Sequence, residues 1–181
     1  MIDKELHVDA DINCSTSTDK DGIITHVCRD FEKISGYTKE ELIGKNHNII
    51  RHPDMPKIIF KIMWMKLHNG EKFIGFIKNK AKDGEYYWLS DKAYLYNKGE
   101  NGACKYFSYK GPMSLRAKHH ITKLYSSLLE KEKNGGIEAS QKYLNEYLNY
   151  RGVTYNEYIE TFENTAGLFK VGYFMTRKLF S

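Results

Sequence analysis

The sequence has few cysteines, no long apolar run and no apolar N-terminus. Its three cysteines, Cys14, Cys28 and Cys104, lie far apart and form no CxxC pair. Neither a disulfide framework nor a zinc site is therefore indicated, and a reducing, cytoplasmic setting is expected. No stretch reaches 18 consecutive apolar residues, and residues 1–11 are acidic, so we expect neither a membrane-spanning helix nor a signal peptide.

The residue patterns of common catalytic sites are also missing. We find no paired carboxylates in a recognisable arrangement, no nucleophile elbow, no phosphate-binding GxxxxGK loop and no metal-ligand spacing. The protein is therefore expected not to be an enzyme. Its net charge of +5 is modest, and the positive excess lies in residues 45–82. That segment matches no recognised nucleic-acid-binding motif, so nucleic acid is not an expected partner.

What the chain does contain is aromatic residues, with 14 tyrosines and 9 phenylalanines. Many of them lie in residues 73–109, where β-favouring runs are separated by Asp83-Gly84 and by residues 97–102. This pattern predicts three successive antiparallel strands. A second hairpin signal, Asp21-Gly22 before residues 23–27, adds two strands nearer the N-terminus.

Helical patterns lie between these two groups of strands. Residues 29–35 predict one short helix. Residues 38–43 predict another, with Thr38 as its N-cap, Glu41 completing a capping box and Gly44 at its end. A longer helix is expected over residues 55–68, because apolar residues recur there at helical spacing.

After the last strand, residues 116–133 predict a helix that ends at Asn134-Gly135-Gly136. Two further helical patterns, around residues 143–148 and 158–162, are separated by a break at Gly152. We therefore expect an N-terminal cap over 1–12, a sensory domain over 13–117, a linker helix over 118–134 and a helical C-terminal extension over 135–181.

Residues 35–44, SGYTKEELIG, resemble the signature of PAS domains, in which a glycine-tyrosine turn enters a capped helix that closes on glycine. Residues 46–56, NHNIIRHPDMP, are more specific. Together with Trp64, FIKN at 76–79, GEYYW at 84–88 and GPMS at 111–114, they resemble the aerotaxis-receptor subfamily of PAS domains. The resemblance covers about residues 13–117. It implies an α+β fold, with a five-stranded antiparallel sheet and helices on one face.

The resemblance also implies a function, because PAS domains of that subfamily hold FAD without a covalent bond and signal its redox state. The family's functional positions fall on the following residues: Arg51, His52, Asp54, Trp64, Asn79 and Tyr87. Aromatic side chains would face the flavin ring, an amide would meet its uracil-like edge, and cations would meet the pyrophosphate.

Each residue also has a structural interpretation. Arg51, His52 and Asp54 would lock the turn before the long helix, with Asp54 favoured by the helix dipole. Trp64 and Tyr87 would be core residues, and Asn79 would merely end a strand.

Other cofactors stay open as alternatives. FMN would need a similar slot, and haem b would need a histidine such as His47, His52 or His68. Photochemistry through a flavin-cysteine adduct is disfavoured, because Gly44-Lys45-Asn46-His47 lacks the cysteine found at the matching position of light-sensing domains. A PAS module without a cofactor, used for dimerisation or scaffolding, is the remaining alternative.

The chain ends at Ser181 without a membrane anchor or a long coiled coil. In this it resembles the free-standing PAS protein of bipartite energy-taxis systems. The resemblance implies a membrane-bound methyl-accepting chemotaxis transducer as partner, with membrane association only through that partner. Residues 137–181 would dock on the transducer or on a second copy in a homodimer. Residues 167–180 would lie on a membrane surface or pack on their own domain.

Overall fold

The computed structural model of the chain describes residues 4–12, 14–98 and 104–163. The chain divides into two compact units. The first, here called the sheet unit, consists of Met1–Met55 and Lys61–Met113. The second, the helical unit, consists of Pro56–Phe60 and Ser114–Ser181. The domain limits expected from the sequence stay predictions.

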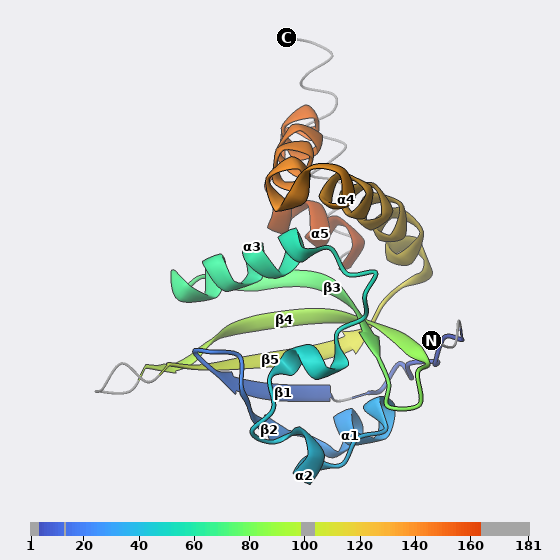
Figure 1. Ribbon diagram of the computed structural model, residues 1–181, viewed down its shortest axis with the longest axis vertical. Helices are drawn as coiled ribbons and strands as arrows, with labels where there is room; N and C mark the ends of the chain where they lie inside the picture. Colours follow the sequence, from blue (N-terminus) through green and yellow to red (C-terminus); the bar gives the residue numbers. More distant parts are fainter. Residues whose placement is uncertain (1–3, 13, 99–103, 164–181) are drawn as a thin grey trace. The chain divides into compact units, whose positions relative to one another are not determined.

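The sheet unit is built on one five-stranded antiparallel sheet, which confirms the predicted α+β class (Figure 1). The strands follow the order β2-β1-β5-β4-β3 across the sheet. Their bounds are β1 Cys14–Asp19, β2 Ile24–Val27, β3 Phe73–Lys80, β4 Tyr86–Lys98 and β5 Cys104–Pro112.

Both hairpins predicted from Asp-Gly pairs are present, and each turns at its glycine. Gly22 has φ 77° between β1 and β2, and Gly84 has φ 97° between β3 and β4. These positive angles suit glycine, which has no Cβ to clash with the backbone. The two aromatic runs at residues 86–89 and 94–96 form the single long strand β4, so the three predicted strands over residues 73–109 are present.

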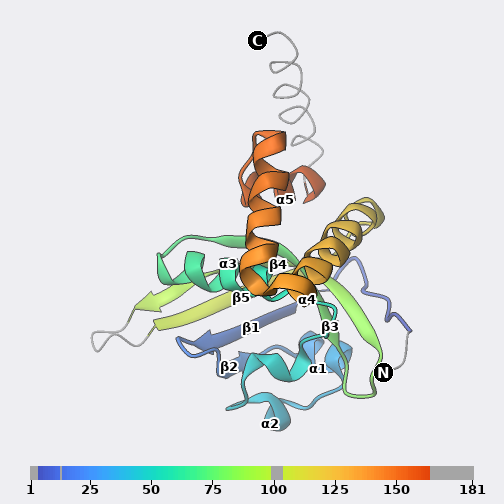
Figure 2. The same cartoon turned by 45° about the horizontal axis from the view of Figure 1, so that its top comes forward.

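Helices α1 Arg29–Ser35, α2 Lys39–Leu42 and the 3-10 helix η1 His47–Ile50 connect β2 to α3 Lys57–His68. The predicted capping box is present at the start of α2, where the Thr38 side chain accepts from the Glu41 N–H and the Glu41 carboxylate accepts from the Thr38 N–H. In both views α1 and α2 lie beside β2 (Figure 2). Helix α3 begins two residues later than predicted, because Met55 precedes a proline and is disfavoured in the α conformation.

The helical unit contains α4 Leu115–Arg151 and α5 Tyr155–Glu163. Gly135 and Gly136 have non-helical backbone angles, so the break predicted there is present, but the helix resumes at once on its far side. The break predicted at Gly152 is also present, with that residue in the left-handed conformation that ends α4. Residues 167–180, which were expected to lie on a membrane surface or to pack on their own domain, lie outside the described residues.

A carboxylate in the helical unit caps the first turn of α3. Glu132 accepts hydrogen bonds from the N–H groups of Lys57 and Ile58, each at 2.9 Å. Ser140, which is fully buried, donates to the same carboxylate at 3.2 Å. Because a helix N-terminus leaves its first N–H groups without intrahelical partners, this distant residue does the work of a local cap. Among the described residues, no helix is both long and apolar enough to cross a membrane.

Candidate functional site

The candidate site lies on the face of the sheet that meets the helices, here called the inner face. The pairing register places one set of alternate side chains on this face: Cys14, Thr16, Asn79, Tyr87, Asp91, Tyr106, Ser108 and Lys110. Three helical elements contact it. Phe31 of α1 lies near Lys110, His47 of η1 lies near Thr16, and Trp64 of α3 packs on Tyr106.

Asn79 and Tyr87 lie directly opposite each other on β3 and β4 and point to the inner face. Both side chains are buried, at 2% and 0% exposure. The Asn79 Nδ2 and the Tyr87 hydroxyl have no hydrogen-bond partner. Burial, then the neighbouring Cys14, raises the pKa of Tyr87, and the Asn79 side chain opposes this rise. Buried polar groups normally have a partner, so these two adjacent atoms mark the part of the inner face that is suited to a polar ligand group.

Trp64 lies toward the other end of the inner face. Its ring meets the Tyr106 ring edge-on at a centroid distance of 5.6 Å and the His68 ring at 5.7 Å. It also lies close to the turn at Gly22, where a Cβ would come within 3.1 Å of the indole. The predicted aromatic contact is therefore on the same face as Asn79 and Tyr87, but not beside them.

Arg51 is the one predicted cation whose backbone register matches the inner face. It forms an isolated antiparallel bridge with Asn79 along the free edge of β3, and residues paired in this way point to the same side. Its guanidinium donates to the Met55 carbonyl at 2.8 Å. Arg51 thus both lies at the rim of the face and fastens the turn that leads into α3.

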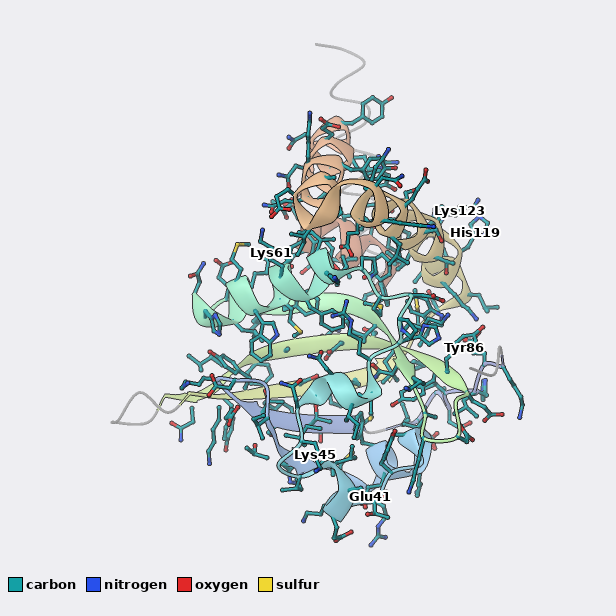
Figure 3. The ribbon with its side chains drawn as sticks, viewed as in Figure 1. Glu41, Lys45, Lys61, Tyr86, His119 and Lys123 are labelled. Carbon is teal, nitrogen blue, oxygen red and sulfur yellow. The ribbon has the colours of Figure 1, made fainter. Side chains whose placement is uncertain are left out.

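His52 and Asp54, by contrast, lie with residues of the opposite face, here called the outer face. The His52 ring packs edge-on against Tyr86 at 5.6 Å, and Asp54 pairs with Lys78 at 2.8 Å. The Lys78 ammonium in turn lies 4.0 Å from the centre of the Tyr86 ring. Figure 3 labels Tyr86, at the start of β4 beside the β3–β4 hairpin. The structure therefore does not bring these two predicted residues to Asn79 and Tyr87.

A buried polar cluster in the middle of the inner face was missed by sequence reasoning. Lys110 and Asp91 are 1% and 5% exposed, and they are joined by Thr16 and Ser108. The strict alternation of Tyr106, Ser108 and Lys110 with Phe107 and Tyr109 is the signal that places this lysine on one face.

Two further ionisable side chains surround this cluster and stay uncharged. Burial, then the nearby Lys110 charge, lowers the pKa of His47 to about 3, although the side chain keeps partial exposure. Burial raises the pKa of the Cys14 thiol to about 12, against a smaller opposing effect of Lys110. Lys110 and Asp91 therefore lie beside two side chains that are uncharged at neutral pH.

A separate cleft of about 380 Å³ lies between the N-terminal segment and α1. Its lining includes Asp9, Asp11 and Asp30, and none of the predicted site residues. Lys33 pairs with Asp30 in this lining, which leaves the carboxylates of Asp9 and Asp11 to disfavour a ligand with phosphate groups. The cleft is therefore not the candidate site.

Comparison with known proteins identifies this arrangement of sheet and helices. The family model described as the PAS fold matches residues 24–108. Those residues form a PAS domain. This PAS domain is similar to that of the aerotaxis receptor of Escherichia coli, with 45% identity over 83 residues, which is 46% of this chain and 16% of the receptor.

A more distant relative is the bacterioopsin transcriptional activator of Halobacterium salinarum, 26% identical over 77 residues, which is 42% of this chain and 11% of the activator. The chain thus matches only a small part of the length of either relative.

Solved structures show the same fold at low sequence identity. An RNA-binding light-oxygen-voltage receptor has a TM-score of 0.53 at 19% identity, covering 62% of this chain and 33% of the receptor chain. A light-oxygen-voltage domain studied with a flavin analogue has a TM-score of 0.52 at 20% identity, covering 67% of this chain and 87% of that domain. These likenesses support the fold alone.

Proposed function

We propose that the protein is a flavin-binding redox sensor of energy taxis, that FAD is its cofactor, and that it signals by protein contact and not by catalysis. The observation that carries the proposal is the pair of buried, unpartnered polar atoms, Asn79 Nδ2 and the Tyr87 hydroxyl, on the inner face. The similarity of the PAS domain to the aerotaxis receptor supports it independently.

The residues present fit a flavin. An amide donor such as Asn79 Nδ2 suits the carbonyl-bearing edge of the flavin ring, and leaving such a donor buried without a partner costs about 1–3 kcal/mol. Trp64 and Tyr106 offer aromatic surface on the same face, and Arg51 offers a cation at its rim. The flavin supplies the redox chemistry when bound, and these side chains bind and orient it.

The identity of the cofactor can be tested with protein purified from cells. Its visible absorption spectrum is recorded before and after reduction with dithionite. We expect a yellow protein with bands in the blue that bleach on reduction, and acid release of FAD identified by mass. Released FMN would keep the sensory function and correct the cofactor. A Soret band would indicate haem, and a colourless protein that stays colourless with added FAD would contradict the proposal.

The signalling route is part of the proposal. We infer that a change in the hydrogen-bonding needs of the ring is met by Asn79 and passed on through the sheet, because coupling of this kind needs only about 1 to 3 kcal/mol. A flavin-loaded Asn79→Asp variant that still switches normally in cells would contradict the role of Asn79.

The partner that receives the signal would be a membrane-bound methyl-accepting chemotaxis transducer, with this protein cytoplasmic and held at the membrane only through it. Residues 137–181 would dock on the transducer or form a homodimer. Deleting them should abolish co-purification with the transducer and spare the flavin content. Loss of both would assign these residues to the stability of the protein, and retention of both would place the docking surface elsewhere.

A further inference from the structure

The ion pair in the middle of the inner face is a charged element that the sheet fold alone does not need. Lys110 Nζ lies 2.8 Å from Thr16 Oγ1 and 3.7 Å from Asp91 Oδ1, and it also donates to Ser108 Oγ. Ser108 Oγ donates to the same Asp91 oxygen. Replacing a buried ion pair by well-packed apolar residues is often neutral or stabilising. Stabilisation of the fold therefore does not explain well why two charges are buried here.

The register places this pair between the two ends of the candidate site. Along β4, Tyr87 pairs with Asn79, Asp91 pairs with Lys110, and Leu95 pairs with Tyr106, which meets Trp64. These β4 positions are four residues apart, or about 13 Å each at the rise of a strand. A ligand that binds at the unpartnered atoms of Asn79 and Tyr87 and extends toward Trp64 would therefore approach Asp91 and Lys110.

The charge of Lys110 already acts on its neighbours across this face. It lies 5.9 Å from the Phe31 ring, and it lowers the pKa of both His47 and Cys14. A charge acts most strongly on its neighbours where the surroundings screen it poorly. A change of charge on a ligand bound here would be felt by the same ammonium.

We propose that Lys110 and Asp91 set the midpoint potential of the flavin, with Lys110 favouring the reduced ring and Asp91 opposing it. This inference rests on the proposed function, since it requires a bound flavin. Reduction adds negative charge to the ring system, so a nearby ammonium stabilises the reduced form and a nearby carboxylate destabilises it. The pair together tunes the potential and keeps the buried charges balanced.

The test compares three flavin-loaded variants with the wild-type protein by redox titration against indicator dyes. Lys110→Met should shift the midpoint potential downward, and Asp91→Asn, which keeps the shape of the side chain, should shift it upward. Lys92→Met is the matched control, because Lys92 is exposed and points to the outer face one residue after Asp91. It should leave the potential at the wild-type value.

Equal potentials in wild type, Lys110→Met and Asp91→Asn would overturn the inference and leave the flavin itself in place. A wild-type protein that takes up no flavin would instead overturn the proposed function. If Lys110→Met does not fold, the Asp91→Asn variant decides alone, and an unchanged or lowered potential contradicts the inference.

A flavin-free readout checks the electrostatic premise separately. In the Lys110→Met protein without cofactor, the pKa of His47 followed by NMR of its imidazole should rise, because the neighbouring cation is gone. An unchanged His47 pKa would show that Lys110 does not act across the inner face, and the inference would fall.

Discussion

The two faces of the sheet differ in how their polar groups are satisfied. On the outer face, His52, Asp54 and Lys78 contact one another and Tyr86, and His52 Nδ1 accepts from the Asp54 N–H at 3.1 Å. On the inner face, Lys110, Asp91, Thr16 and Ser108 also contact one another, but Asn79 Nδ2 and the Tyr87 hydroxyl have no hydrogen-bond partner. The outer contacts are those of a structural lock. The two unpartnered inner atoms are the ones that we propose meet the cofactor.

One contiguous motif contributes residues to both faces of the sheet. Arg51 bridges to Asn79 at the inner face, while the next residue, His52, packs against Tyr86. Successive residues of an extended segment point to opposite sides. The RHPDMP segment therefore does not present all of its side chains to one face of the sheet.

The largest effect on FAD affinity is expected at Asn79. In Asn79→Leu, FAD affinity should fall about tenfold or more, equivalent to about 1.4 kcal/mol, because the amide that we propose meets the ring edge is gone. The flavin-free protein should be at least as stable as wild type, since a buried unpartnered donor is removed. FAD titration by fluorescence and urea unfolding measure both quantities.

Lys80→Met is the control for this pair of measurements, because Lys80 follows Asn79 on β3 and points to the other face. It should change neither quantity appreciably. If Asn79→Leu binds FAD with wild-type affinity, the proposal that the inner face binds the cofactor through Asn79 is contradicted.

His52→Ala should show the reverse pattern. His52 is 4% exposed and packs against Tyr86, so its loss should cost about 2 kcal/mol of unfolding free energy, with FAD affinity unchanged. Urea unfolding and FAD titration again give both values. A variant of wild-type stability that binds FAD weakly would place His52 at the cofactor.

Acid should destabilise the protein partly through His47. Its pKa of about 3 in the folded protein lies below the ordinary value of 6.5, so the folded state keeps it neutral while the unfolded chain takes up a proton. This contribution to stability is present above about pH 6.5 and is lost as the pH falls toward 3, at up to about 1.4 kcal/mol per pH unit. In His47→Gln, the fall of unfolding free energy over this range should be shallower than in wild type. Parallel curves would contradict the burial of a neutral His47.

The smallest effect is expected at Asp54. Its side chain is 59% exposed, so Asp54→Asn should cost at most about 1 kcal/mol, and the difference from wild type should shrink in high salt. Unfolding at low and high ionic strength checks this. A drop in FAD affinity, at any salt concentration, would return Asp54 to the candidate site.

Much of the fold follows from local residue chemistry. The Asp21-Gly22 and Asp83-Gly84 turns and the Thr38–Glu41 capping box appear where the sequence predicts them, because each depends on a few neighbouring residues. The break at Gly135-Gly136 is local in the same sense. What local chemistry does not predict is that the helix resumes directly beyond it, or that Glu132 caps α3 from 75 positions away.

The candidate site was less predictable for a related reason. Asn79 and Tyr87 were expected to contact the cofactor, and the structure places them opposite each other with unpartnered atoms. The partnership of Lys110 with Asp91 depends on the register of β4 against β5, which no local pattern specifies. The separation of His52 from Asn79 depends on how the turn before α3 runs along the edge of β3.

The most direct test of the central claim is an NMR titration of the flavin-free protein with FAD that follows the Asn79 side-chain amide and the His52 ring. The account predicts a large shift of the Asn79 Nδ2 resonances that saturates with the flavin, and little change at His52. A shift at His52 with an unchanged Asn79 amide would contradict it.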